Sequence, residues 1–279
     1  MAMEFRDKFI AFVDLLGFKE MIKAAEAGTG RSLSEIDQLW SELSRNGAQE
    51  SIKKYGSHIC PESSFLQNDL DFKVTQISDC VILSAEPSPA GVINIVNHCW
   101  NAAINLLPKG VMVRGYVTRG KIYHDGLKIA GTGYIKAYQQ ETAVAAFKRT
   151  ATEEGTPYIE IDPEVCEYVS KQTDDCVRKM FGRYVKSDGQ TTAIFPFQVL
   201  AHSFGLGVGF PPLDGEKEKA HNNNIRRLLG DFKRQVLLNV EGSAAKAQQK
   251  AEHYASALDD QLKVCDNTDH IIDTLMGKR

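Results

Sequence analysis

An apolar run near the start of the chain, FIAFVDLLGF at residues 9–18, carries a single charged side chain, Asp14. Short apolar runs closed by a glycine, here Gly17, are typical of buried β-strands, and we predict a strand over residues 5–14. Burying a carboxylate in such a strand costs free energy unless the group is paired or binds a cation. We therefore expect Asp14 at the end of the strand, in contact with another group.

The segments that follow are assigned from periodicity, caps and turn residues. A capping box, Ser32 with Glu35, opens one of the helices, and Ser78-Asp79 is expected to be the turn of a hairpin. The expected elements are helices at 18–27 and 32–54, strands at 72–77 and 80–85, a helix at 90–107, a strand at 111–123, a helix at 134–148, a strand at 158–162 and a short helix that begins at Asp162-Pro163.

This order of elements is that of a ferredoxin-like βαββαβ sheet with an extra helix after the first strand, an α+β fold. Beyond it we expect a hairpin around Asp188-Gly189, a loop rich in Gly and Pro at 204–218, and additional C-terminal helices over 219–264. We predict a first domain at 1–203 and, at 204–279, a loop and helical appendage that packs on the core or in a dimer.

Composition excludes several classes of protein. The chain has 279 residues, 43% of them hydrophobic, and a formal net charge of −3, which argues against a general nucleic-acid binder. No apolar run approaches the ~18 residues of a membrane span, and the N-terminus lacks an apolar signal core. The six cysteines are scattered without zinc-site spacing, and we interpret them as reduced thiols of a cytoplasmic protein.

Two aspartates are expected to meet at one end of the sheet. Strand one of a βαββαβ sheet is central and neighbours strand three, so Asp14 lies beside the hairpin turn that contains Asp79. Oxygen ligands of this kind suit Mg²⁺ or Mn²⁺, and the start of the next helix suits a phosphate. Each aspartate also has an ordinary structural interpretation, Asp14 as a helix N-cap and Asp79 as a turn residue.

Four short motifs together resemble the class III nucleotidyl cyclases. DLLGF at 14–18 is similar to their first metal motif and ISD at 77–79 to their second. RGYVTRG at 114–120 resembles their strand that ends in Gly, and GTGYIKAYQQE at 131–141 resembles their Gly-led catalytic helix. The resemblance covers residues 5–165 and implies the cyclase catalytic domain for residues 1–203.

The departures from that family point to one of its branches. Ile135 and Gln139 stand where purine cyclases have a catalytic Asn and Arg, and Thr75 and Lys128 stand where they have the Lys and Asp that read the base. The motifs resemble instead the pyrimidine cyclases of bacterial Pycsar anti-phage systems. That resemblance implies a homodimer with shared active sites, UTP or CTP as substrate with UTP favoured, and a separate effector activated by the cyclic nucleotide.

The resemblance also assigns a metal site and a triphosphate site. Asp14, Asp79 and the Leu15 carbonyl would hold two divalent ions, Mn²⁺ or Mg²⁺. These ions would promote attack of the ribose 3′-oxygen on the α-phosphorus. The backbone N–H groups expected around the phosphates are those of Leu16, Gly17, Phe18 and Lys19.

The remaining candidate residues would contact the transition state or the base. Arg119 or Arg114 would replace the missing arginine; because they are five residues apart on one strand, they point to opposite faces, and we favour Arg119. Alternatively, Arg114 could form an ion pair at the surface or in a dimer. Thr75 could form a hydrogen bond with the edge of a pyrimidine base, or it could be an ordinary strand residue. Tyr138 could contact the base or the ribose, or it could pack in the core.

Other functions remain open at this point. One is a cyclase for a purine nucleotide or a related palm-type nucleotidyl transferase. Another is a catalytically inactive cyclase-like domain that senses a nucleotide or a partner, which Ile135 and Gln139 favour and the two aspartates disfavour. A third is a scaffolding protein that dimerises through its C-terminal helices.

Overall fold

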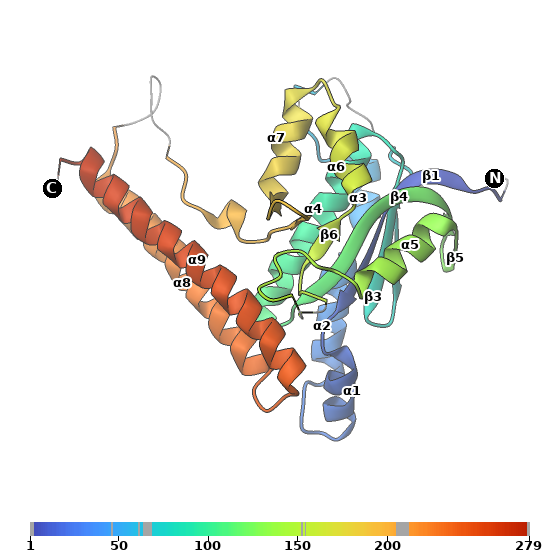
Figure 1. Cartoon of the computed structure of the whole chain (residues 1–279), viewed down its shortest axis with the longest axis horizontal. Helices are drawn as coiled ribbons and strands as arrows, with labels where there is room; N and C mark the ends of the chain where they lie inside the picture. Colours follow the sequence, from blue (N-terminus) through green and yellow to red (C-terminus); the bar gives the residue numbers. More distant parts are fainter. Residues whose placement is uncertain are drawn as a thin grey trace. The chain divides into compact units, whose positions relative to one another are not determined.

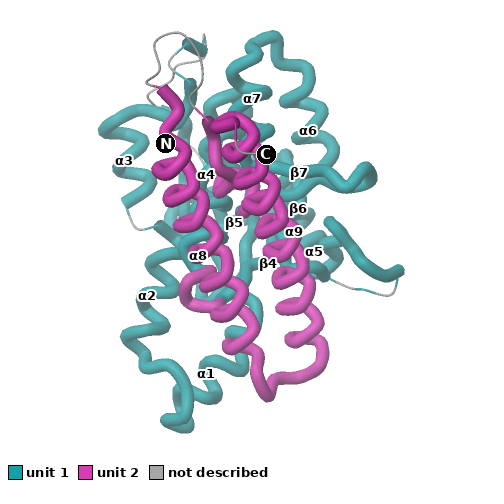
Figure 2. Tube along the Cα trace, turned by 90° about the vertical axis from the view of Figure 1, so that its left-hand side faces the viewer, with its two compact units in different colours: residues 1–106, 111–196 teal, residues 107–110, 197–279 magenta. Residues whose placement is uncertain are grey.

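The computed structural model describes residues 3–45, 47–60, 62–63, 69–151, 153, 155–204 and 212–277. It divides into two compact units, which we call unit 1 (residues 1–106 and 111–196) and unit 2 (residues 107–110 and 197–279) (Figure 2). Unit 1 contains the whole sheet. Unit 2 consists mainly of the C-terminal helices.

An eight-stranded sheet forms the centre of unit 1, in the order β2-β3-β1-β4-β6-β8-β7, with β5 paired to β4. β1 lies antiparallel between β3 and β4, and β2 is antiparallel to β3. The order β2-β3-β1-β4 is that of a βαββαβ core, so the predicted α+β fold class is confirmed. The strands are β1 (Arg6–Leu15), β2 (Lys73–Ile77), β3 (Cys80–Ala85), β4 (Val113–Asp125), β5 (Lys128–Ala130), β6 (Ile159–Ile161), β7 (Val185–Ser187) and β8 (Thr192–Ile194).

Helices cover both faces of this sheet. On one face, which we call the α5 face, Ile10 and Phe12 of β1 pack with Ile82 and with Ala137 of α5, which runs along β4 (Figure 1). Alternate side chains of β1 point to the other face, where α4 packs. The helices of unit 1 are α1 (Phe18–Glu26), α2 (Leu33–Ser44), α3 (Ala48–Tyr55), α4 (Pro89–Leu106), α5 (Thr132–Glu141), α6 (Pro163–Ser170) and α7 (Asp175–Tyr184).

Some element boundaries differ from the sequence prediction. The single helix expected at 32–54 is two helices, because Arg45 and Gly47 take positive φ angles of 48° and 88°, which do not continue an α-helix. The helix expected at 134–148 begins at Thr132 and ends at Glu141. β5 and α7 were not predicted. The capping box of Ser32 and Glu35 is present, and Asp162 caps α6 with Pro163 in its first turn.

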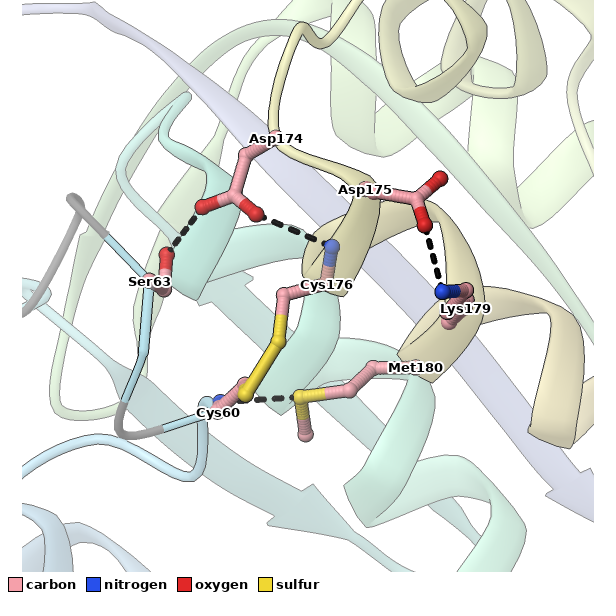
Figure 3. The surroundings of a disulfide bond; sticks show 7 residues. All are labelled: Cys60, Ser63, Asp174, Asp175, Cys176, Lys179 and Met180. Atoms are coloured by element: carbon pink, nitrogen blue, oxygen red, sulfur yellow. Dashed lines mark hydrogen bonds and ion pairs between the residues drawn. A yellow bond between two sulfur atoms is a disulfide. The ribbon is translucent and has the colours of Figure 1, made fainter.

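Two of the six cysteines are paired, which corrects the expectation of reduced thiols. A disulfide joins Cys60, in the segment after α3, to Cys176 at the start of α7 (Figure 3). The partners are 116 residues apart in the sequence, so their spacing gave no sign of the bond. Glu62 lies close to both sulfur atoms. Cys80, Cys99, Cys166 and Cys265 are free thiols.

Unit 2 is built on two long helices that lie side by side, α8 (Gly215–Asn239) and α9 (Ala245–Leu275), with short helices η1 (Leu107–Lys109) and η2 (Gln198–Leu200) (Figure 1). The buried Asn222 amide donates to the Cys265 carbonyl at 2.7 Å, and Lys233 pairs with Asp259. Within the described part of the chain, no helix combines the length and hydropathy that a bilayer span requires. Residues 205–211 of the expected loop lie outside the described residues.

Candidate active site

Asp14 and Asp79 lie together at one end of the sheet, as the topology predicted. Asp14 is the penultimate residue of β1 and is paired across the ladder with Cys80 on β3 and Arg114 on β4. Asp79 occupies the tight turn before β3, and its carbonyl accepts a hydrogen bond of 3.0 Å from the Leu15 amide. The two carboxyl groups are close enough for their charges to interact, and this interaction contributes to the raised pKa of Asp14.

The environment of Asp14 favours its protonated form. Burial, followed by the charges of Asp79 and Glu141, raises the pKa of Asp14 to about 7, although Arg114 acts in the opposite direction. Burial and the same carboxylates raise the pKa of the neighbouring Cys80 thiol to about 12. This end of the sheet therefore has an excess of negative charge, and two facing carboxylates of this kind fit a hard divalent cation such as Mg²⁺ or Mn²⁺.

Glu141, at the end of α5, is a member of this cluster that the sequence did not identify as a site residue. Its carboxylate is buried and accepts a hydrogen bond from Arg114 Nε at 2.5 Å. Gly155 lets the guanidinium approach, because a Cβ atom there would lie 2.5 Å from Arg114 Nη1. Glu141 is thus engaged by Arg114, and the ion pair holds the guanidinium near Asp14.

Arg119 lies away from this cluster. It is paired in register with Phe9, five residues before Asp14 on β1, a separation of roughly 17 Å along the strand. Its guanidinium donates two hydrogen bonds to Asp7, at 2.7 and 3.0 Å, and lies over the rings of Phe9 and Tyr168. The expected opposite orientation of the two arginines is observed, but Arg114, not the favoured Arg119, is the one beside the aspartates.

The turn between β1 and α1 contains the five residues expected around the metal and the phosphates. Gly17 has a φ of 81°, a left-handed conformation that suits glycine, and it is the N-cap of α1. The Leu16 amide donates to the Met112 carbonyl at 3.0 Å, so its N–H is not available to a phosphate. Phe18 and Lys19 begin the helix, where backbone N–H groups have no intrahelical acceptor. Leu15 is buried, and a metal contact through its carbonyl stays a prediction.

Thr75 is committed to a buried network and is not available as a base-reading group. Its hydroxyl donates to the Gly126 carbonyl at 2.7 Å and lies 2.8 Å from His124 Nε2, while Ser84 lies 2.8 Å from His124 Nδ1. Burial, together with the charges of two nearby lysines, lowers the pKa of His124 to about 4, so the ring is neutral at physiological pH. The network is structural support for β2, β3 and β4.

Tyr138 remains open to solvent on the α5 face. Its side chain is 55% exposed, and its ring contacts Phe12 edge-to-face with centroids 5.4 Å apart. Phe12 lies two residues before Asp14 on the same face of β1. Tyr138 is therefore placed where it can contact a ligand or a second chain near the aspartates.

Comparison with known proteins gives no more than weak structural support. The sequence matches no protein-family model and no curated protein. Among solved structures, the fold is similar to the catalytic core of a rhodopsin–guanylyl cyclase with converted specificity in complex with ATPalphaS. That match has 14% sequence identity and a TM-score of 0.35, and covers 68% of this chain and 95% of the other. A likeness of this size carries no argument about activity.

Proposed function

We propose that this protein is a metal-dependent nucleotidyl cyclase of the class III kind that converts UTP or CTP to the 3′,5′-cyclic monophosphate. The observation that supports this proposal most strongly is the placement of Asp14 and Asp79 side by side at one end of the sheet. The pair lies directly before the N-terminus of α1, where backbone amides suit a triphosphate. A carboxylate pair beside an anion-binding helix end is suited to phosphoryl or nucleotidyl transfer.

Each side chain then has a defined role in the reaction. Asp14 and Asp79 would hold Mg²⁺ or Mn²⁺, which when bound supplies positive charge to the triphosphate and lowers the pKa of the ribose 3′-hydroxyl. The Phe18 and Lys19 amides would orient the terminal phosphates. Arg114, held by Glu141, is closer to the aspartates than Arg119, so we assign the stabilisation of transition-state charge to Arg114.

The proposed preference for a pyrimidine rests on the residues at the two positions where purine cyclases have the Lys and Asp that read the base. Thr75 and Lys128 stand in the positions of that pair, and the Thr75 hydroxyl is already engaged, so neither supplies the contacts of a purine cyclase. Tyr138, exposed beside Phe12, would contact the base or ribose across a homodimer with shared sites. The product would act on a separate effector, as in anti-phage signalling.

A second candidate function is a nucleotide sensor without turnover. Ile135 is 50% exposed on α5, and Gln139 is exposed on the same helix. Ile135 has no amide and Gln139 has no guanidinium, so the two positions lack the groups that an active purine cyclase has there. In a sensor, the aspartates would bind the metal–nucleotide complex and Arg114 would only neutralise Glu141.

A turnover assay separates the two functions. The protein is incubated with ATP, GTP, CTP and UTP in separate reactions with Mn²⁺, and the products are resolved by mass. A cyclic monophosphate from UTP or CTP alone is expected, and Asp14→Asn or Asp79→Asn should abolish it. Asp7→Asn is the matched control, because it removes a carboxylate from the far end of β1 and should leave turnover unchanged.

Three results would count against the cyclase. Full turnover by the Asp14→Asn, Asp79→Asn double variant would exclude the metal site. Products from ATP or GTP would exclude the pyrimidine preference. Nucleotide binding without any product would favour the sensor.

A further inference from the structure

A polar cavity lies in unit 1, on the α4 side of the sheet. It has a volume of about 280 Å³ and is lined by Arg45 at the end of α2, by α3 and the segment after it, and by α4. Because Asp14 lies on the α5 face, the cavity is separate from the candidate active site. The lining residues used below are Arg45, Ser57, Asn97 and His98.

Arg45 supplies a positive charge to this cavity. It ends α2 with a φ of 48°, and it is half-buried. Within the described part of the chain, its guanidinium has no hydrogen bond and no ion pair. Burial lowers the pKa of Arg45, and the charge of Glu42 offsets this only in part. A half-buried guanidinium with five donors is the group that best recognises a phosphate or carboxylate.

His98 supplies a buried acceptor without a partner. Its Nε2 lies 3.2 Å from the Leu43 carbonyl, which can only accept, so the proton is on Nε2 and Nδ1 is an acceptor. The side chain is 2% exposed, and within the described residues its Nδ1 has no hydrogen-bond partner. Burial and then the charge of Arg45 lower the pKa of His98 to about 3, so the ring remains neutral. Leaving such an atom unsatisfied is costly, and a ligand donor would satisfy it.

Asn97 offers a further donor. Its side-chain oxygen accepts a hydrogen bond of 3.0 Å from the Asn101 amide, which orients the Asn97 NH₂ group as the end available to an acceptor. The cavity thus combines a cation and an amide donor with one buried acceptor. An anion alone would leave His98 unsatisfied, and a neutral alcohol would leave Arg45 unpaired.

We propose that this cavity binds a phosphate group that carries or adjoins a hydroxyl, either inorganic phosphate or a small hydroxylated phosphate ester. The phosphate oxygens accept hydrogen bonds from the Arg45 guanidinium and the Asn97 amide. The hydroxyl donates to His98 Nδ1. No bond is made or broken, and none of these residues belongs to the candidate active site.

Calorimetric titration of the full chain at pH 7 tests the site with inorganic phosphate, sulfate and glycerol phosphate. Phosphate should bind more tightly than sulfate, because hydrogen phosphate carries a hydroxyl and sulfate does not. Arg45→Gln should weaken phosphate binding by about tenfold or more. Lys53→Gln is the matched control, because it removes one positive charge from an exposed position on α3 and should bind like the unaltered chain. Tighter binding of glycerol phosphate than of phosphate would assign an ester, and the reverse would assign the inorganic ion.

Two further readouts keep the test decisive if Arg45→Gln does not fold. Ser57→Asp places a carboxylate in the lining that would pair with Arg45, and it should abolish phosphate binding. Phosphate should also shift the imidazole NMR signals of His98. The proposal is overturned if the unaltered chain does not bind phosphate at millimolar concentration, or if Ser57→Asp or Arg45→Gln binds it normally. Equal affinities for sulfate and phosphate would overturn the contact to His98.

Discussion

At the scale of single residues, the candidate active site is defined by the excess of negative charge around Asp14. The charge of Asp79 acts on Asp14, and Glu141 contributes a third carboxylate that Arg114 neutralises. Removing or adding one charge in this group should therefore change both stability and metal binding.

The raised pKa of Asp14 predicts a measurable pH dependence. Between about pH 4 and pH 7 the folded chain keeps a proton that the unfolded chain releases, so this group makes the protein less stable as pH rises through that range. Asp14→Asn should remove this slope. Excess Mn²⁺ should restore stability near pH 7 in the unaltered chain only, because the metal binds the ionised carboxylates of the native state.

Thermal unfolding of both chains at pH 5, 6, 7 and 8, with and without Mn²⁺, measures the effect. Parallel melting curves for the two chains across this range, or equal stabilisation of both by Mn²⁺, would contradict a metal-binding carboxylate at Asp14.

The two arginines of β4 should differ strongly in their contribution to stability. Arg114→Met leaves the buried Glu141 carboxylate unpaired, which should cost about 3 kcal/mol or more of unfolding free energy. Arg119→Met breaks an ion pair with Asp7, whose side chain is 43% exposed, and should cost about 1 kcal/mol or less. Urea unfolding compares the two variants.

Turnover should follow the same division, with a large loss for Arg114→Met and little change for Arg119→Met. Equal stability losses would show that the Arg114–Glu141 pair is not buried as described. A larger loss of turnover in Arg119→Met would return the transition-state role to that residue.

At the scale of elements, the position of α5 depends on a glycine contact with β4. A Cβ atom at Gly133 would lie 2.5 Å from Ile10 Cδ1 and 2.9 Å from the Gly120 carbonyl carbon. The helix can therefore approach the sheet closely only without a side chain at this position. Since α5 ends at Glu141, the same contact sets where Glu141 meets Arg114.

Gly133→Ala should therefore lower the unfolding free energy by about 1–3 kcal/mol through overpacking. Gly182→Ala is the matched control: Gly182 is also within a helix, but a Cβ atom there meets nothing within 4 Å. That substitution should stabilise the chain by about 0.5–1 kcal/mol. Urea unfolding measures both, and a neutral Gly133→Ala variant would show that α5 is not packed against β4 at Gly133.

At the scale of the whole molecule, the two units are interleaved along the chain. Residues 107–110 follow α4 of unit 1 but belong to unit 2, where η1 packs against α8. A Cβ atom at Gly110 would lie 2.3 Å from the Gln235 carbonyl oxygen. A chain truncated after residue 203 would therefore lack the helix α8 that packs on residues 107–110. The division into domains at 1–203 and 204–279 stays a prediction.

Gly110→Ala compared with Gly28→Ala tests this packing. Both glycines have a φ of 69°, so both substitutions carry a similar backbone cost, but a Cβ atom at Gly28 meets nothing within 4 Å. Gly110→Ala should cost about 1–3 kcal/mol more than Gly28→Ala in thermal or urea unfolding. Equal costs would indicate that residues 107–110 do not pack on α8.

The sequence alone determined the properties that depend on local pattern. A short apolar run closed by a glycine defined β1, turn residues defined the hairpin of β2 and β3, and the resulting βαββαβ order was sufficient to bring Asp14 to Asp79. Helix caps such as Ser32 and Asp162 are local as well, and they were correctly predicted.

Tertiary structure decided the properties that depend on contacts distant in sequence. The pairing of Cys60 with Cys176, the ion pair of Arg114 with Glu141 and the engagement of Thr75 by Gly126 join segments that no local pattern relates. Arg114 and Arg119 occupy similar sequence contexts, and only the register against β1 shows which of them lies beside Asp14. Local propensities act over a few residues, whereas burial and ion pairing depend on where the whole chain has folded.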